Sequence, residues 1–345
     1  MRAAVITSYG GPSSVTIADV PRPEIRDAHD VIVSLKAAAL NHLDLFVTNG
    51  LPGITHEFPH VIGCDGAGMV ESVGDAVTRV RPGDRVLINP GVWCGTCHWC
   101  RLGEESLCRT YRVLGEHLPG TFAEFVRVSD HCAEPISAGM SWTEAAAFPL
   151  AALTAWRMVA TRAALTAGEE VLIWGIGGGV ALAALAAAKH LGARVIVTSS
   201  SDDKLARATA LGADVAINYG TADVVKEVRA ATGGRGCDVI VDSVGEATWE
   251  RSLRCLARGG RLVTCGGTTG PNLAFDVRKL FWHGWSILGS TMGNRREFAE
   301  IVARFGRGEL RPVVDRVYPL EDVVAALTRM ERGEQFGKIV LEIQR

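Results

Sequence analysis

Residues 170–193 have the sequence EVLIWGIGGGVALAALAAAKHLGA, and this stretch decides the fold. Its first part, EVLIW at 170–174, is an apolar run typical of a buried strand, and it ends at a glycine run. The segment 179–193 continues as an alanine-rich helical pattern, and its last residues, Lys189, His190 and Gly192, suit a helix C-terminus. The stretch therefore predicts a strand, a tight glycine turn and a helix in direct succession.

The chain that follows repeats this rhythm. Short, nearly all-apolar runs alternate with helical stretches, and these runs are RVIVTS, ADVAINY, CDVIVDSVG and GRLVTCGG. Strands that are apolar on both faces belong in a parallel sheet covered by helices. Right-handed crossovers between such units build a doubly wound α/β fold.

The chain before about residue 140 has a different character. Runs of β-type residues, DVIVSLKAAAL (30–40), AGMVESVG (67–74) and DRVLINP (84–90), are separated by Gly, Pro and Asp. This pattern predicts a small β-rich domain. From about residue 295 we expect a helix (REFAEIVARF), a strand (PVVDRVYPL), a second helix and a closing strand (GKIVLEI). A length of 345 residues suits two domains.

The composition excludes several classes of partner. The net charge is −2, so the chain has no basic surplus that would attract nucleic acid or lipid headgroups. The amino terminus does not resemble a signal peptide, and no apolar run is long enough to span a bilayer. The 9 cysteines form an odd set, which argues against a disulfide framework. We expect a cytoplasmic protein with reduced thiols and no membrane or nucleic-acid partner.

The glycine run predicts a dinucleotide site, because it lies between a strand and a helix. Glycines let the backbone approach a pyrophosphate, and the helix amino end offers free N–H groups. The register Gly175-x-Gly177-x-x-Val180 fails at its third position, whereas Gly175-x-x-Gly178-x-x-Ala181 has a small residue at each step and is preferred. The expected contacts come from Gly175, Gly178, Gly179, Val180 and Ala181. The alternative is a tight turn without a ligand.

The choice between NAD and NADP depends on the end of the next strand. An acidic residue there would bind the ribose 2′-hydroxyl, but ARVIVT ends in Ser199, Ser200 and Ser201. Asp202 and Asp203 come later and are expected to cap the following helix. Serine hydroxyls can donate to a 2′-phosphate, and Lys204 supplies a positive charge unless it is simply a solvated helix residue. The pattern favours NADPH over NADH.

The stretch CGTCHWCRLGEESLC, residues 94–108, contains four thiols: Cys94, Cys97, Cys100 and Cys108. Four thiolates on a short loop can close a tetrahedral shell around one Zn²⁺. The ferredoxin pattern requires a fourth Cys after three residues and then Pro, and neither occurs here. His98 could replace one thiol, but with four cysteines present we expect it to be a bystander. A closed shell has no position for water, so this zinc is predicted to be structural.

Together these motifs resemble the medium-chain dehydrogenase/reductase superfamily, which contains the zinc alcohol dehydrogenases and their quinone-reductase relatives. The resemblance extends over the whole chain and includes HVIGCDGAGMVESVG, RPGDRV, the four-cysteine loop and FGKIVLEI. It implies a GroES-like β-rich catalytic domain (1–130 and 295–345) that carries the zinc loop 94–108. It also implies a Rossmann cofactor-binding domain at 131–294, and a homodimer or homotetramer.

The resemblance also allows the catalytic zinc of the alcohol dehydrogenases to be checked. Their first-loop cysteine corresponds to Asn41, their Gly-His-Glu motif to Gly63-Cys64-Asp65, and their junction cysteine to Leu150. The sequence therefore looks closer to the zinc-free reductases of the superfamily. In the quinone-reductase branch, residues matching Lys204 and Tyr219 hold the 2′-phosphate, and a threonine matching Thr154 packs against the nicotinamide. A second zinc held by His42, Cys64, Asp65 or His60 stays open as an alternative.

The leading hypothesis is an NADPH-dependent reductase that transfers hydride to an activated C=C bond or a quinone without a catalytic zinc. Asn41 is expected to donate to the developing enolate oxygen, His42 is a candidate proton donor, and Cys64 could line the pocket. The substrate would be a small apolar carbonyl compound, an enone or a quinone. The alternatives are an alcohol or aldehyde dehydrogenase with an unusual zinc site, and a non-catalytic NADPH-binding relative.

Overall fold

The computed structural model describes residues 1–343, and the chain divides into two compact units. Unit 1 consists of Met1–Ala151 with Asn294–Arg345, and unit 2 is Ala152–Gly293. The segment 131–151, which the sequence analysis assigns to the cofactor domain, belongs by its contacts to unit 1. The reason is that the strand Ala133–Pro135 pairs antiparallel with the strand Arg85–Ile88 of unit 1.

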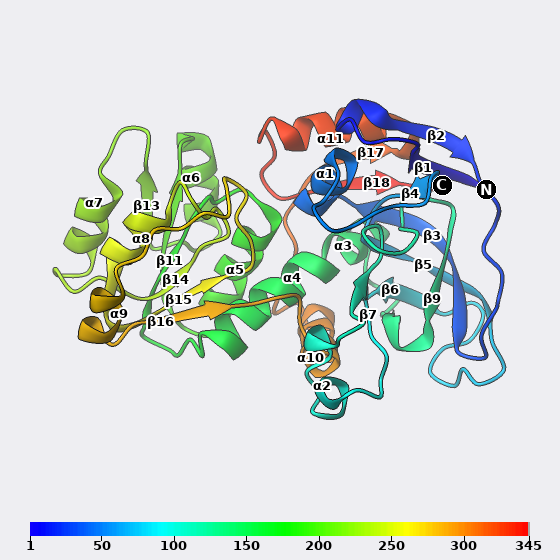
Figure 1. The fold of residues 1–345 in the computed structure, drawn as a ribbon, viewed down its shortest axis with the longest axis horizontal. Coiled ribbons are helices and arrows are strands. Elements are labelled where there is room, and N and C mark those ends of the chain that lie inside the picture. The colour runs from blue at the N-terminus through cyan, green and yellow to red at the C-terminus, as the bar shows by residue number, and fades with distance from the viewer. Residues whose placement is uncertain (344–345) are drawn as a thin grey trace. The chain divides into compact units, whose positions relative to one another are not determined.

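Unit 2 is built on a six-stranded sheet with the order β13-β12-β11-β14-β15-β16 (Figure 1). All neighbouring strands are parallel, and the order reverses direction beside β11, as in a doubly wound fold. The strands are β11 (Glu170–Ile173), β12 (Arg194–Ser199), β13 (Val215–Asn218), β14 (Cys237–Val241), β15 (Leu256–Thr264) and β16 (Ser286–Gly289). The predicted class of this domain is therefore confirmed.

Helices connect these strands, and their apolar residues form one core with the sheet. They are α5 (Gly179–His190), α6 (Asp202–Ala210), α7 (Val224–Ala231), α8 (Trp249–Cys255) and α9 (Val277–His283). The central strands β11 and β14 are buried along most of their length, which explains why their sequences are apolar at nearly every position. The helix α4 (Pro149–Trp156) and a π-helical turn at Arg157–Arg162 precede this series.

Unit 1 contains a seven-stranded sheet with the path β10-β6-β5-β3-β18-β17, and β9 also pairs with β3. A three-stranded sheet, β2-β1-β4, and the pair β7-β8 complete it. The strands are β1 (Arg2–Ile6), β2 (Val15–Asp19), β3 (Asp30–Ala39), β4 (His60–Val61), β5 (Asp65–Val73), β6 (Arg85–Ile88), β7 (Gly91–Val92), β8 (Arg112–Val113), β9 (Phe125–Ser129), β10 (Ala133–Pro135), β17 (Val314–Pro319) and β18 (Lys338–Glu342). The helices are α1 (His42–Asn49), α2 (His98–Arg101), α3 (Trp142–Ala147), α10 (Arg295–Gly306) and α11 (Val323–Glu331).

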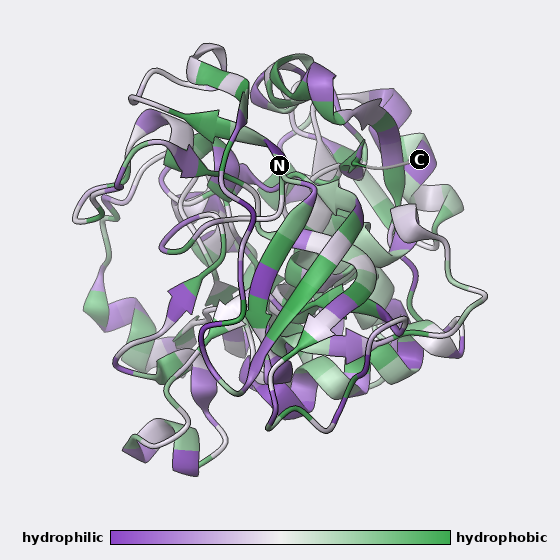
Figure 2. Ribbon diagram, turned by 90° about the vertical axis from the view of Figure 1, so that its right-hand side faces the viewer, coloured by the Kyte–Doolittle hydropathy of each residue, from purple (hydrophilic) through white to green (hydrophobic). Residues whose placement is uncertain are grey.

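The register of the large sheet positions the candidate site. Strand β3 is antiparallel to both β5 and β18, and Ala39 pairs with Asp65 on one side and with Val340 on the other. The carboxyl end of β3 therefore meets the amino ends of β5 and β18 at one edge of the sheet. Figure 2 shows long strands at its centre that are largely hydrophobic and carry shorter hydrophilic segments.

Among residues 1–343, no helix combines the length and the hydrophobicity that a membrane span requires.

Candidate functional site

A buried polar cluster lies where β3, β5 and β18 meet. The Lys338 ammonium donates to Asn41 Oδ1 at 2.6 Å and to Asp65 Oδ2 at 2.9 Å. The Asn41 amide nitrogen donates to the same Asp65 oxygen at 2.9 Å. Because a lysine can only donate, this contact fixes the orientation of the Asn41 amide. All three side chains are buried, so the cluster is a desolvated ion pair bridged by an amide.

Asp44 and Cys64 extend this cluster. Asp44 accepts from the backbone N–H of Asn41 at 2.7 Å, and the Cys64 thiol lies 3.8 Å from its other carboxylate oxygen. Burial raises the pKa of Asp44 to about 7, although this backbone hydrogen bond and Lys338 oppose the shift. Burial raises the pKa of Cys64 well above its ordinary value. Cys64 is therefore a neutral, buried thiol, which favours a packing role over a nucleophilic one.

The candidate ligands for a second zinc do not converge, and two of them, Asp65 and His60, have other hydrogen-bond partners. One Asp65 oxygen accepts from Asn41 and Lys338, and the other accepts from the backbone N–H of Leu150 at 2.8 Å. The Nε2 atom of His60 lies 2.9 Å from the Gly115 carbonyl oxygen. His42 is exposed, and its pKa is lowered by the protein packed around it and by Lys338. These residues offer no convergent donor set, so they do not fit a zinc ion.

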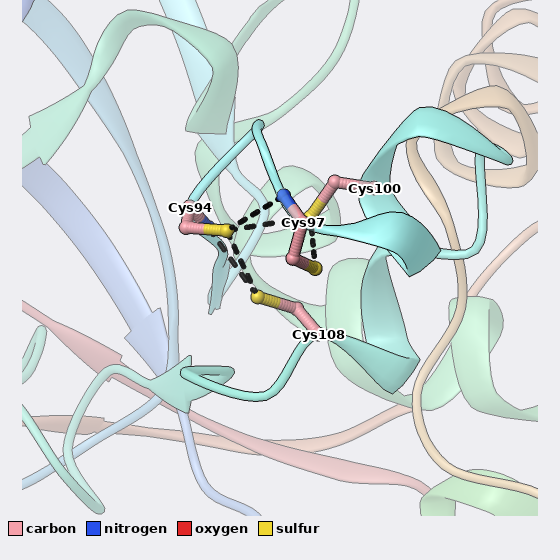
Figure 3. Close-up of side chains that lie close together, drawn as sticks. All are labelled: Cys94, Cys97, Cys100 and Cys108. Carbon is pink, nitrogen blue, oxygen red and sulfur yellow. Dashed lines mark hydrogen bonds between the residues drawn. The ribbon is translucent and has the colours of Figure 1, made fainter.

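The four-cysteine loop does converge (Figure 3). Its sulfur atoms all lie within 4.8 Å of one another, and the Cys94–Cys108 and Cys97–Cys100 separations are both 3.6 Å. A tetrahedral zinc with bonds of about 2.3 Å requires sulfur atoms about 3.8 Å apart. Within residues 1–343, this is the one group of three or more ligand-type side chains that comes together in this way. His98 lies in α2, outside the group, as expected for a bystander.

The electrostatics of the loop also suit a metal. Backbone N–H groups of Thr96 and Cys97 lower the pKa of Cys94 to about 5. Burial and the neighbouring thiols raise the pKa of Cys100 to about 12. Without a cation the loop therefore cannot hold four thiolates at neutral pH, whereas a zinc ion would compensate their charge. Cys94, Cys97, Cys100 and Cys108 would hold such a zinc, and their closed shell would give it a structural role.

The glycine turn of unit 2 joins the end of β11 to the amino end of α5. Gly175 has φ 66° and Gly177 has φ 128°, so these two positions require glycine. Gly178 has φ −75° and is the N-cap of α5. The N–H of Gly175 donates to Thr198 Oγ1 at 3.3 Å, which ties the turn to β12. Gly179, Val180 and Ala181 form the first turn of α5, whose free N–H groups could face a pyrophosphate.

The end of β12 carries hydroxyls where a carboxylate would select NAD. Ser199 is buried and its hydroxyl accepts from the N–H of Ser201 at 3.1 Å, while Ser200 is exposed. The expectation that Asp202 and Asp203 cap α6 is wrong, because Ser201 is the N-cap and accepts from the N–H of Lys204. Tyr219 lies just beyond the neighbouring strand β13 and is 41% exposed. Ser200, Lys204 and Tyr219 are therefore at the carboxyl edge of the sheet, where cofactors bind.

Thr154 lies in α4 and is buried, and its hydroxyl contacts the sulfur of Met292 at 3.8 Å. Met292 follows β16 and has φ 46°, a left-handed conformation that non-glycine residues rarely adopt. Backbone strain of this kind is often found beside ligands. Met292 is not predicted as a site residue, because nothing in its sequence neighbourhood indicates a positive φ.

Two members of the polar cluster, Lys338 and Asp44, are not predicted from the sequence. A signal for Lys338 exists, because it begins the otherwise apolar run KIVL in the closing strand. A buried lysine needs an anionic partner, and Asp65 is that partner. Asp44 has a weaker signal, namely its place at the third position of the helix that begins after Asn41.

Comparison with known proteins gives a consistent result. The family model for the alcohol dehydrogenase GroES-like domain matches residues 27–138, and that for zinc-binding dehydrogenase matches residues 179–307. An NAD-dependent alcohol dehydrogenase of Sulfolobus acidocaldarius is 33% identical over 99% of this chain and 100% of its own length. A crotonyl-CoA carboxylase/reductase of Cereibacter sphaeroides is 31% identical over 94% of this chain and 83% of its own length. A solved NAD-dependent alcohol dehydrogenase is 44% identical, has a TM-score of 0.96 and covers 100% of both chains.

Proposed function

Because this chain belongs to the medium-chain dehydrogenase/reductase superfamily, which includes the zinc alcohol dehydrogenases, and is an oxidoreductase of that type, we propose that it reduces an activated C=C bond or a quinone without a catalytic zinc. One observation carries this proposal: Asn41, which matches the first-loop zinc ligand, forms a closed hydrogen-bonded cluster with Lys338 and Asp65. Any metal bound to Asp65 would have to displace a buried ammonium group from it.

Asn41 would bind the substrate oxygen. One of its amide hydrogens is used by Asp65, and the other points to the Ala39 carbonyl, which is 3.5 Å away and at the limit of hydrogen bonding. The second hydrogen is therefore available to an oxygen that gains negative charge as hydride arrives. Lys338 and Asp65 would hold the amide in this orientation. The bound nicotinamide supplies the hydride.

His42 would supply the proton. Its side chain is exposed, whereas Asp44 and Cys64 are buried, so it is the accessible titratable group next to Asn41 in the chain. Its lowered pKa leaves a minor fraction of the ring as imidazolium at pH 7, and this fraction would donate the proton and return to the neutral imidazole. A solvent-exposed ring can then recover its proton from water.

The test is a substrate screen with matched variants. Purified protein would be assayed with a cyclic enone, a benzoquinone and a series of primary and secondary alcohols. We expect turnover of the enone or the quinone, and a loss of about 10²-fold in kcat in N41A. N49A changes an asparagine at the other end of α1, whose amide donates to Leu45, and should retain activity. Turnover of alcohols alone, or full activity in N41A, would refute the proposal.

The proposed cofactor is NADPH, in contrast to the NAD named for the relatives. Serines replace an acidic residue at the end of β12, and Lys204 and Tyr219 lie near them at that edge of the sheet. The carboxylate of Asp202 accepts from Asn218 at 2.7 Å and so is engaged with β13. The measurement is the ratio of kcat/KM for NADPH to that for NADH. A ratio below one would contradict this part of the proposal.

Alcohol oxidation with NAD is the second candidate, because relatives and solved neighbours along the whole chain are named alcohol dehydrogenases. It would require a second zinc per chain in this family. Elemental analysis therefore separates the two candidates. One zinc per chain supports the reductase, and two support the dehydrogenase.

The proposed assembly is a homodimer or a homotetramer. Strand β16 is the outer strand of its sheet, and Phe281 and Trp282 on the preceding helix are 70% and 69% exposed. Free strand edges and exposed aromatic rings are features of surfaces that other chains cover. Light scattering of the eluted protein measures the mass, and a monomer would exclude this assembly.

A further inference from the structure

A cavity of about 790 Å³ lies in unit 2, remote from the glycine turn. Its walls come from the ends of α7 and α8, from α9, and from the loops that enter β14, β15 and β16 (Figure 1). These loops are at the amino edge of the parallel sheet. The glycine turn follows the carboxyl end of β11 and so lies at the opposite edge. The cavity is therefore separate from the cofactor site.

The walls of the cavity are strongly basic. Five Arg and Lys side chains line it, namely Arg229, Arg235, Arg254, Arg258 and Lys279. Two carboxylates, Glu250 and Asp276, also line it. The carboxylate of Asp276 is engaged by the guanidinium of Arg278, and Arg235 is paired with Asp238 outside the cavity. Arg254 and Lys279 are exposed and form no ion pair with a carboxylate among residues 1–343, although Lys279 contributes to the lowered pKa of Asp276. They leave a positive charge that an anion would neutralise.

Backbone carbonyls position one of these cations. Arg229 donates to the carbonyl oxygens of Gly234 and Arg254 at 2.8 Å each, so its guanidinium braces the end of α7 against the end of α8. These hydrogen bonds give Arg229 a structural role. It holds Arg254 in place, while Lys279 reaches the cavity from α9. Arg254 and Lys279 thus come from different elements and face one cavity.

The cavity also offers aromatic surface. The rings of His283 and Trp285 are stacked, with centroids 4.7 Å apart, and Phe275 on the same wall is 38% exposed. The indole N–H of Trp285 donates to the Ala257 carbonyl at 2.8 Å, which fixes the ring in the wall. Aromatic side chains of this kind stack on planar ligand rings. Glu250 adds an acceptor that suits an amino group on such a ring.

We propose that this cavity is a second ligand site, and that it binds a nucleoside monophosphate, with the phosphate on Arg254 and Lys279 and the base against the aromatic wall. The volume is within the range of small-molecule sites and accommodates a mononucleotide. The proposal does not depend on the reaction that the protein catalyses, because it uses no residue of the polar cluster or of the glycine turn.

The test is calorimetric titration of AMP into the full-length protein already saturated with NADPH, so that the cofactor site is occupied. We expect AMP to bind under these conditions. K279E and R254E should each weaken this binding about tenfold or more, because each replaces a phosphate partner by a repelling charge. K226E is the matched control, since Lys226 is an exposed residue of α7 that does not line the cavity. Titration of NADPH and thermal melting of each variant show whether it remains folded.

Two further titrations identify the ligand class. Adenosine tests the base alone, and inorganic phosphate tests the anion alone; both should bind more weakly than AMP. Three results would overturn the proposal: no AMP binding to the NADPH-saturated protein, equal binding by K279E, R254E and K226E, or binding of inorganic phosphate as tight as that of AMP.

Discussion

Replacement of Lys338 by methionine tests whether the buried ammonium group holds the polar cluster together. Methionine has nearly the same length as lysine but no charge and no N–H group. In K338M the carboxylate of Asp65 stays buried, and it keeps the hydrogen bonds from Asn41 and from the Leu150 N–H but loses its cation. Asn41 Oδ1 loses the donor that lies 2.6 Å away.

The magnitude follows from the burial of both charges. The side chains of Lys338 and Asp65 are 5% and 0% exposed, so solvent does not screen the pair. Removal of one partner from such a pair costs about 3–5 kcal/mol of the free energy of unfolding. One kcal/mol shifts the melting temperature by about 2–4 °C in a unit of this size, so K338M should melt roughly 6–20 °C below the wild type.

The assay is thermal and urea unfolding of four proteins: the wild type, K338M, the double variant D65N/K338M and K36M. The double variant removes both charges and should recover most of the loss, because no buried charge is then left alone. Lys36 lies on β3 of the same sheet and is partly exposed, so K36M should stay within about 0.5 kcal/mol of the wild type. If K338M is as stable as K36M, or if D65N/K338M is no more stable than K338M, the reasoning is refuted.

Three other predictions concern the titration of Asp44, the zinc loop and the cofactor. The pKa of Asp44 is about 7 in the folded protein against an ordinary 3.8, so the wild type should lose stability relative to D44N as the pH rises from about 4 to about 7. The expected loss in the free energy of unfolding is on the order of 4 kcal/mol, and urea unfolding at several pH values would measure it. Parallel stability curves for the two proteins would contradict this prediction. Elemental analysis should find one zinc per chain in the wild type and almost none in C97S. C265A is the control, because the thiol of Cys265 is outside the loop, and it should also bind one zinc. An unchanged zinc content in C97S would contradict the assignment. K204A should raise the KM for NADPH about tenfold and leave that for NADH nearly unchanged, and equal effects on both would argue against a role at the 2′-phosphate.

Much of the fold was predictable because its signals are local. The strand, glycine turn and helix of residues 170–193 lie consecutively in the chain, and α5 and β11 begin where the apolar pattern begins. The four cysteines lie within one loop, so their spacing alone indicates a zinc site. The segment 131–151 was harder to place, because β10 joins unit 1 through pairing with β6, a strand more than forty residues earlier in the chain. Such pairing leaves no local mark in the sequence.

The polar cluster shows the limit of sequence reasoning more clearly. Its members Asn41, Asp65 and Lys338 are separated by 24 and 273 positions, and only the antiparallel register of β3 with β5 and β18 brings them together. The resemblance marks Asn41, Cys64 and Asp65 as departures from the zinc-site motifs, but it does not indicate that Lys338 lies beside them. Lys338 comes from β18, where the next three residues are apolar and buried.

The chemistry of the cluster explains why the departures occur together. An asparagine in place of a cysteine removes a thiolate, and a neutral Cys64 in place of a histidine removes a good ligand, so Asp65 would remain as a buried carboxylate without a metal. The Lys338 ammonium places a positive charge 2.9 Å from the Asp65 carboxylate and orients the amide of Asn41 so that its nitrogen faces Asp65. A buried carboxylate, a cation and an oriented amide thus form one unit in which each member requires the others. The amide hydrogen left over after these bonds is the one that the proposed reduction uses.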